Sequence, residues 1–427
     1  MKDPYTILII GGGFAGVELA ERLLNSKLDI SVILVDKNNY NFFPPLLYQV
    51  ATGYLDVSNI TYPFRKHFRG YSNFSFIMSE LVEIDSENNT AILSTGNIKY
   101  DELVIATGTV TNYFGIDKVR RHALPMKTIT DAIYLKNTWL KRIEEASRTA
   151  DEYLRNQLTT FVVAGGGPTG VEIAGMLSEL KKDILFKDYP ELKVLAFEIY
   201  LVDGLPNLLA PMSKDSQAYA LKSLKTSGVI IKLGHNVEDF KNNTVYLADG
   251  SQISSSNLLW TAGVTAQKFN GLPSDAYGKG NRLLVNPYNN VLGMKNVYAI
   301  GDTALMTSDS NFPQGHPQLA QVAIQQAKLL AQNITANKRG KSRRQFKYND
   351  KGSMAIIRRN KAVADLNGPL KHLNGFPAWV VWVLVHLMSL INFRNKLTTF
   401  FNWMNAYITK DQPLRMIIDS GNESKNQ

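Results

Sequence analysis

The first part of the chain alternates short apolar runs, glycines and amphipathic segments. Thr6–Ile10 is apolar and leads into Gly11–Gly13, residues 17–24 have helical spacing, and Ile30–Val35 is a second apolar run that ends at Asp36. This order predicts a strand, a turn, a helix and a second strand.

The same order recurs about 150 residues later, which is typical of a repeated module. Thr160–Ala164 is apolar, Gly165–Gly170 is glycine-rich, Val171–Leu180 has helical spacing, and Ile199–Val202 leads to Asp203. The repeat predicts an α/β fold with two Rossmann-like nucleotide-binding modules. Further strands are expected at Glu102–Ala106, Asn257–Ala262 and Tyr298–Asp302, and a helix at Gln318–Asn333.

The C-terminal part has a different pattern. Phe376–Ile391 is almost continuously apolar, but its 16 residues fall short of the roughly 20 that a membrane span requires. Between Leu397 and Ile408, apolar residues recur at intervals of three or four with Trp403 beside them, which predicts an amphipathic helix. We expect an interfacial membrane anchor, and the alternative is a dimer interface or a packed core.

Charge is distributed unevenly along the chain. The net charge is +10, and residues 338–410 hold 14 Lys or Arg against Asp350 and Asp365, a net +12, so the remainder is −2. Because this charge borders the apolar stretch and no nucleic-acid motif accompanies it, we expect an anionic membrane surface as the partner and no nucleic acid.

The first glycine turn, Gly11-x-Gly13-x-x-Gly16, joins a strand to a helix. Its glycines allow the backbone to approach a pyrophosphate, whose charge is met by the N-terminus of the helix. Asp36 lies 20 residues after Gly16, where a carboxylate accepts hydrogen bonds from an adenosine ribose.

The second turn, Gly165-x-Gly167-x-x-Gly170, has Asp203 in the equivalent place. A carboxylate there favours the free 2′-hydroxyl of NADH and repels the 2′-phosphate of NADPH. Two dinucleotide sites in one chain indicate FAD facing NADH, with hydride passing from the nicotinamide to the flavin. Thr107, Gly108 and Asp302, at strand ends, are expected to complete the flavin site.

Residue types narrow the electron acceptor. The chain has no cysteine, so it lacks the redox pair of disulfide reductases and any thiolate metal site. Its six histidines are scattered without ligand spacing, and we expect no metal site.

Several motifs together resemble the type II NADH:quinone oxidoreductases, the single-chain NADH dehydrogenases that do not pump protons. The motifs are Gly11–Gly16, Phe43–Leu47 with Ala51–Gly53, Gly165–Glu172, Trp260–Val264, Ala320–Gln325 and Phe393–Lys396. The resemblance implies non-covalent FAD, NADH as the donor, and menaquinone or ubiquinone as the acceptor.

The resemblance also implies roles for individual residues. Glu172 would act in catalysis near the nicotinamide and the flavin. FAD would be lined by Gly11, Gly12, Gly13, Phe14, Ala15, Gly16, Asp36, Val82, Thr107, Gly108, Asp302 and Ala320. NADH would be lined by Gly165, Gly167, Thr169, Gly170, Glu172, Asp203 and Gly263, and the quinone by Gln321, Gln325 and Lys396.

The expected domains are a discontinuous FAD domain at 1–113 and 265–345, an NADH domain at 114–264, and a membrane-association region at 346–427. The resemblance further implies a homodimer. Two positions depart from the common family pattern: Asp203 stands where Glu is frequent, and Gln318-Leu319 where Pro-Thr is frequent.

The N-terminal residues lack a basic leader and a small-residue cleavage site. We therefore expect a peripheral, monotopic enzyme on the cytoplasmic face of a bacterial inner membrane. Two rival hypotheses remain: a soluble NADH-dependent flavoprotein reductase with a protein acceptor, and a flavoprotein sensor whose output is conformational.

Overall fold

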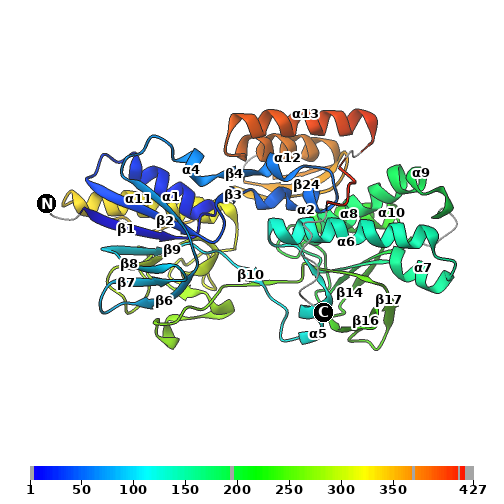
Figure 1. The fold of residues 1–427 in the computed structure, drawn as a ribbon, viewed down its shortest axis with the longest axis horizontal. Helices are drawn as coiled ribbons and strands as arrows, with labels where there is room; N and C mark the ends of the chain where they lie inside the picture. The colour runs from blue at the N-terminus through cyan, green and yellow to red at the C-terminus, as the bar shows by residue number, and fades with distance from the viewer. Residues whose placement is uncertain (1–3, 193–196, 368–370, 412–413, 419–427) are drawn as a thin grey trace. The chain divides into compact units, whose positions relative to one another are not determined.

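The computed structural model describes residues 4–192, 197–367, 371–411 and 414–418. The chain forms two compact units (Figure 1), each assembled from separate stretches of sequence. Unit 1 contains residues 1–42, 61–110 and 264–350, and unit 2 contains residues 43–60, 111–263 and 351–427.

Unit 1 is built on a five-stranded parallel sheet in the order β21-β9-β1-β2-β5. Its strands are β1 (Tyr5–Ile10), β2 (Ile30–Asp36), β5 (Phe74–Met78), β9 (Glu102–Ile105) and β21 (Val297–Ala299). Because side chains alternate along a strand, Ile7 and Ile9 face one layer while Leu8 and Ile10 face the other.

Helices cover one face of this sheet and a second sheet covers the other. Helices α1 (Phe14–Leu24) and α11 (Ala320–Lys338) pack against each other over the first face (Figure 1). The second face packs against the antiparallel strands β6 (Leu81–Asp85), β7 (Thr90–Leu93) and β8 (Gly96–Lys99). Strands β3 (Tyr40–Phe42) and β4 (Thr61–Pro63) pair antiparallel, with residues 43–60 between them in the sequence.

Unit 2 repeats this plan with a parallel sheet in the order β11-β18-β12-β13-β14. The strands are β11 (Leu124–Pro125), β12 (Phe161–Ala164), β13 (Ile199–Asp203), β14 (Val229–Leu233) and β18 (Asn257–Trp260). One face packs on the antiparallel strands β15 (Val237–Lys241), β16 (Thr244–Leu247) and β17 (Gln252–Ser254). The sheet also contacts α6 (Ile129–Arg148), α7 (Glu152–Thr159), α8 (Pro168–Leu180) and α10 (Lys214–Thr226).

The predicted order of strand, glycine turn, helix and strand is confirmed in both units, with boundaries that shift by a few residues. The expected strand at Asn257–Ala262 ends at Trp260, and the helix expected from Gln318 begins at Ala320 and extends to Lys338.

A short segment, residues 43–60, packs within unit 2. It contains α2 (Leu47–Ala51) and α3 (Val57–Ile60). The indole nitrogen of the buried Trp139 donates to the Ala51 carbonyl at 3.0 Å, which holds α2 against α6. This attachment was not predicted from the sequence.

The C-terminal part of unit 2 begins with an antiparallel sheet that the sequence pattern did not reveal. Its strands are β23 (Gly352–Arg358), β24 (Lys361–Leu366) and β25 (His372–Asn374). Helices α12 (Gly375–Ser389) and α13 (Phe393–Thr409) follow. Helix α13 contains the predicted amphipathic helix at Leu397–Ile408, and α12 covers most of the apolar run at Phe376–Ile391.

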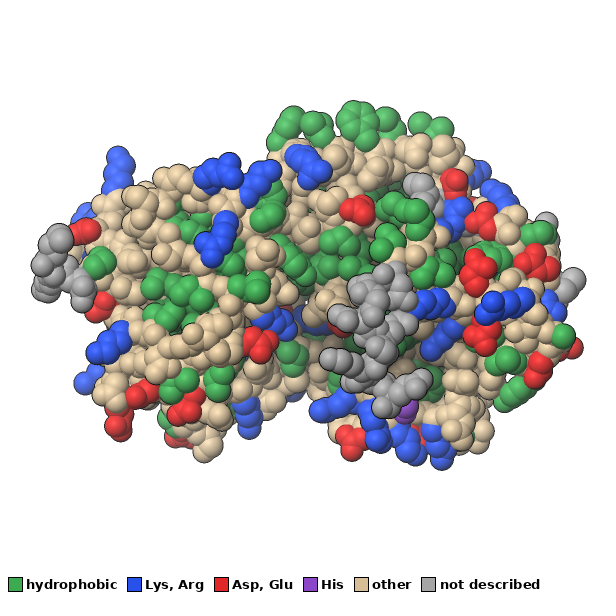
Figure 2. Space-filling model, in the orientation of Figure 1, with side chains coloured by type: hydrophobic (Ala, Val, Ile, Leu, Met, Phe, Trp, Pro, Cys, Tyr) green, Lys and Arg blue, Asp and Glu red, His purple; other side chains and the backbone are tan. Residues whose placement is uncertain are grey.

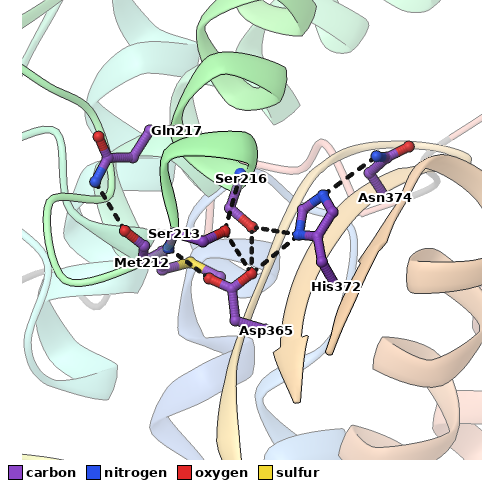
Figure 3. Close-up of polar contacts among 7 residues, drawn as sticks. All are labelled: Met212, Ser213, Ser216, Gln217, Asp365, His372 and Asn374. Carbon is purple, nitrogen blue, oxygen red and sulfur yellow. Dashed lines mark hydrogen bonds and ion pairs between the residues drawn. The ribbon is translucent and has the colours of Figure 1, made fainter. Parts of the chain in front are cut away.

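A cluster of polar side chains fastens this sheet to α10 (Figure 3). Ser213 caps α10, and its backbone N–H and hydroxyl both donate to the Asp365 carboxylate of β24 at 2.7 Å. The Ser216 hydroxyl adds a 2.8 Å bond to the same carboxylate, and His372 Nδ1 lies 3.0 Å from it. Burial opposes ionisation of Asp365, but these hydrogen bonds outweigh it and hold the pKa of Asp365 below its ordinary value.

Although the cluster contains serine, histidine and aspartate, its geometry is not that of a hydrolytic triad. In a triad the carboxylate and the hydroxyl face opposite ring nitrogens of the histidine. Here both face Nδ1, because Ser216 Oγ lies 3.3 Å from it, while Nε2 faces Asn374. We therefore interpret the cluster as a structural clasp.

We expect Asp365→Asn to lower the melting temperature by about 2–6 °C, because it removes a charge that accepts several hydrogen bonds, about 1–3 kcal/mol in total. Because the pKa of Asp365 is depressed in the folded state, its carboxylate stabilises the fold at pH values above the pKa that it has in the unfolded chain. The difference in melting temperature between variant and wild type should therefore shrink below about pH 4. Thermal unfolding at pH 7 and pH 3.5 tests this. Asp275→Asn, at an exposed position of unit 1, is the control, and an equal shift in both variants would contradict the clasp.

Candidate functional site

The first glycine turn is shaped by backbone atoms that come very close to one another. A Cβ at Gly11 would meet the Ala106 carbonyl oxygen at 2.5 Å, and Gly11 has a φ of +101°. A Cβ at Gly16 would overlap the Gly11 carbonyl, whereas Gly13 faces open space. Gly13 is also the N-cap of α1 and offers no side-chain cap. The helix therefore begins with uncapped N–H groups beside an open volume, which is the arrangement that holds a phosphate.

Asp36 lies at the end of β2, beside this turn. Its Oδ2 accepts the Gly12 N–H at 2.7 Å, and its Oδ1 accepts the Asn38 N–H at 2.8 Å. Burial raises the pKa of Asp36, and these hydrogen bonds oppose that rise in part. The carboxylate is thus fixed at the turn with lone pairs left to accept from a ribose.

Two later segments of unit 1 reach the same end of the sheet. Thr107, directly after β9, has a buried hydroxyl with no protein partner in the described structure. Gly108 has a φ of +65° and open space on its Cβ side. An unpartnered buried hydroxyl beside an open glycine fits a bound cofactor that supplies the missing hydrogen bond.

Asp302 lies in a short 3-10 helix, Gly301–Thr303, that follows β21. The Gly301 N–H donates to the buried Gln326 side chain at 2.7 Å, which ties this turn to α11. A Cβ at Gly301 would contact Ala15 and Ala323. Asp302 is therefore positioned next to the start of α1.

Ala320 is the first residue of α11, and Val82 is an exposed residue of β6.

The second glycine turn has the same close backbone contacts as the first. A Cβ at Gly165 would meet the Thr261 carbonyl oxygen at 2.6 Å, one at Gly170 would overlap the Gly165 carbonyl, and Gly167 faces open space. Gly167 caps α8 without a side-chain hydrogen bond. Thr169 is exposed in the first turn of α8.

Asp203 matches Asp36 in position and contact. One carboxylate oxygen accepts the Gly166 N–H, and the other accepts the Leu205 N–H at 2.6 Å. Gly263 lies beyond β18, where a Cβ would meet the Phe114 ring at 2.7 Å. Unit 2 thus repeats the glycine turn and the carboxylate that unit 1 presents.

Glu172 lies on α8, just past this turn, and its side chain is 9% exposed. Burial raises the pKa of Glu172 well above its ordinary value, and a hydrogen bond from the Ile356 N–H of β23 opposes only part of that rise. A buried carboxyl whose pKa is raised in this way is suited to hold a proton and to give it up in a reaction.

Sequence reasoning missed the polar residues near Glu172. The buried Tyr48 of α2 interacts electrostatically with Glu172. Gln49 donates to the Tyr48 hydroxyl at 2.9 Å and accepts from the Trp403 indole of α13 at 2.7 Å. Their position in the sequence could have indicated them, because Tyr48 and Gln49 lie between two of the recognised motifs, Phe43–Leu47 and Ala51–Gly53.

The residues predicted for the quinone lie in different surroundings. Gln325 is paired with the backbone of Asn349, donating to its carbonyl at 2.9 Å and accepting its N–H at 3.0 Å. Gln321 lies one turn earlier on α11, and Lys396 lies in the first turn of α13. The buried glutamine of α11 is Gln326, whose side chain accepts the Gly301 N–H.

Helices α12 and α13 expose a band of large apolar side chains (Figure 2). We define this apolar face as Phe376, Leu384, Val385, Met388, Phe393, Leu397, Phe400, Phe401, Met404, Tyr407 and Ile408. Such a concentration is typical of an interaction surface. Within the described ranges, no helix combines the length and the apolar character that crossing a membrane requires. Across the same ranges, no group of three or more His, Asp or Glu could hold a metal ion.

Comparisons with known proteins agree with this geometry. Residues 5–327 match the pyridine nucleotide-disulphide oxidoreductase family, and residues 351–410 match the NDH2 C-terminal domain. The type II NADH:quinone oxidoreductase Ndh of Mycobacterium tuberculosis is 34% identical over 420 residues, covering 95% of this chain and 88% of that protein. The type II NADH:quinone oxidoreductase of Haemophilus influenzae is 28% identical, covering 84% and 86%.

Among solved structures, NDH2 of Plasmodium falciparum in complex with NADH has a TM-score of 0.86 at 20% identity, covering 98% of this chain and all of that one. The sulfide:quinone oxidoreductase of Aquifex aeolicus has a TM-score of 0.73 at 20% identity, covering 92% of each chain. These likenesses show the fold. With two matched nucleotide turns and a relative above 30% identity along nearly its whole length, the chain belongs to the type II NADH:quinone oxidoreductase family.

Proposed function

We propose that this protein oxidises NADH and reduces a membrane quinone, with FAD as the electron carrier between them. The observation that carries the proposal is the pair of matched glycine turns, each with its own carboxylate, in a chain of this family. FAD, when bound, accepts hydride from NADH and passes two electrons to the quinone. The overall reaction converts NADH, quinone and one proton into NAD⁺ and quinol.

In this proposal, unit 1 binds FAD non-covalently. The uncapped start of α1 would hold the pyrophosphate, and Asp36 would accept from the ribose. The Thr107 hydroxyl and Asp302 would bond to polar atoms farther along the cofactor.

Unit 2 would bind NADH at the equivalent turn. Gly165–Gly170 would hold its pyrophosphate, and Asp203 would bind the free ribose hydroxyls. Glu172 would exchange a proton during quinone reduction, and Gln321, Gln325 and Lys396 would border the quinone. To bind the quinone, Gln325 would have to break its hydrogen bonds with the backbone of Asn349.

The acceptor would be menaquinone or ubiquinone, reached from the membrane surface by the apolar face. Arg394 and Lys410 are exposed at the two ends of α13, where they would meet anionic lipid headgroups. We place the protein on the cytoplasmic side of a bacterial inner membrane, as a homodimer. The rival reading, a soluble reductase with a protein acceptor, gives this face no role.

We expect the purified flavoprotein to reduce a ubiquinone or menaquinone analogue with NADH, and Glu172→Gln to lower quinone turnover by at least about tenfold, because an amide cannot exchange a proton. Flavin reduction by NADH, followed by stopped-flow absorbance, should change far less. Glu238→Gln, at an exposed site on β15, is the matched control. Wild-type protein that oxidises NADH without reducing any quinone would contradict the proposed function.

Coenzyme choice gives a separate test. We expect a strong preference for NADH over NADPH, measured as the ratio of kcat/KM values. Asp203→Asn should narrow that ratio by about tenfold or more, since it removes the charge that repels a 2′-phosphate at close range. The control Asp275→Asn should leave the ratio unchanged. An unchanged ratio in Asp203→Asn would contradict the placement of its carboxylate at the ribose.

The membrane assignment can be tested with polar substitutions on the apolar face. Phe401→Gln with Ile408→Gln should weaken co-sedimentation with vesicles containing phosphatidylglycerol by at least about tenfold, because each buried apolar side chain contributes about 1.5–3 kcal/mol. Met78→Gln with Leu292→Gln changes equally exposed apolar residues of unit 1 and should have no effect. Unchanged binding, or loss of dimerisation with normal lipid binding, would refute the assignment.

A further inference from the structure

Strand β23 and the residue that follows it, Arg359, contact helix α8 at three successive places. The Ile356 N–H bonds to the Glu172 carboxyl, and the Arg359 N–H bonds to the Glu179 carboxyl at 2.7 Å. Between them, Gly175 lies so close to the strand that a Cβ would overlap the Ile357 carbonyl. Residues seven apart share a helix face, so the two carboxyls lie in line on α8. The buried Glu172 is held by an amide of β23, and the partly buried Glu179 by the amide of Arg359, directly after that strand.

Two tyrosines of the segment 43–60 interact electrostatically with these carboxyls. Tyr48 interacts electrostatically with Glu172, Tyr54 and Glu179, and Tyr54 interacts with Glu179 and Arg359. Burial raises the pKa of both phenols, so both keep their protons at neutral pH. A phenol passes a proton by accepting one at its oxygen while it releases its own.

The hydrogen bonds of Tyr48 orient its proton. The Trp403 indole is a donor only, so its bond to Gln49 assigns the oxygen of that amide to Trp403 and the NH₂ group to Tyr48. The Tyr48 oxygen therefore accepts from Gln49, and its own proton is not used in that bond.

Glu179 has the environment of a group that exchanges protons near neutral pH. Burial raises its pKa to about 7, Asp183 contributes to the rise, and the Arg359 amide and the charges of Arg359 and Arg358 oppose it. These residues, with Tyr48 and Tyr54, are the charged and titratable groups that act on it. Arg359 also lies over the Tyr407 ring of α13 at 5.2 Å.

The reaction creates a need for such a group. Hydride from NADH supplies two electrons and one proton, whereas a quinone takes two of each to become a quinol. We propose that Glu179 is a proton-relay residue that, through Tyr54 and Tyr48, returns to Glu172 the one further proton that each turnover consumes. This inference rests on the proposed function. No bond other than O–H is made or broken along the relay, and the proton comes from solvent near Arg359.

The test compares two acceptors in Glu179→Gln, which keeps shape and removes the exchangeable proton. Ferricyanide takes electrons without protons, so its turnover should stay within about twofold of wild type. Turnover with a water-soluble ubiquinone analogue at pH 7.5 should fall at least about tenfold, and an inflection near pH 7 in the wild-type profile should disappear. Tyr54→Phe, which removes one hydroxyl, should show the same selectivity, and Glu179→Asp should recover part of the quinone rate.

An infrared pH titration provides a readout independent of turnover. A protonated carboxyl band that titrates near pH 7 should be present in wild type and in Glu238→Gln, and absent from Glu179→Gln. The proposal is overturned if Glu179→Gln keeps the wild-type quinone rate and pH profile, or loses quinone and ferricyanide turnover equally. In either result, wild-type quinone reduction would still support the proposed function, whereas its absence in wild type would overturn that function itself.

Discussion

Helix α8 brings together the nucleotide turn, the acidic residues and the C-terminal sheet because backbone can approach it without a side chain in between. At its N-terminus, Gly165 and Gly170 let the turn close against β18 and against itself, and at its middle Gly175 lets β23 lie against it. Glycine in a helix interior costs about 1 kcal/mol relative to alanine. Here that cost is offset by backbone contacts that no other residue permits.

The close approach of β23 also explains how carboxyls are kept in a buried place. A buried carboxyl without partners is costly, but the strand supplies one amide to Glu172, and Arg359, in the turn that follows the strand, supplies another to Glu179. One amide satisfies an oxygen without supplying a full counter-charge. The pKa therefore stays raised, as a proton-exchanging group requires, instead of being depressed as it is for Asp365 in its clasp of several donors.

The nucleotide-binding parts of the fold could be predicted because their constraints are local. Glycines three residues apart between a strand and a helix leave little choice of backbone, and a carboxylate at the end of the next strand follows from the same geometry. Asp36 and Asp203 accordingly lie where the pattern expected them, and they accept the N–H groups of Gly12 and Gly166, each the residue after the first glycine of its motif.

The features that escaped prediction depend on contacts between distant parts of the chain. Nothing near Glu179 in the sequence marks its environment, because the groups that interact with it include Arg359 and Tyr54, which are far away in sequence. The β23–β24 hairpin did leave a local trace: two short apolar runs flank Arg359-Asn360, and Asn360 takes a positive φ, as asparagine often does in turns. The many basic residues around those runs indicated a charged surface and not a pair of strands.

The same hairpin links Glu172 and Glu179 to the helix α13, which carries part of the apolar face. Arg359 donates to the Tyr407 carbonyl of α13 at 3.4 Å and lies over its ring, while Trp403 of the same helix orients Gln49 and through it Tyr48. A quinone that enters from hydrocarbon arrives without water, so protons must reach it through the protein. The helix that carries the apolar face thus also positions the side chains that would deliver them.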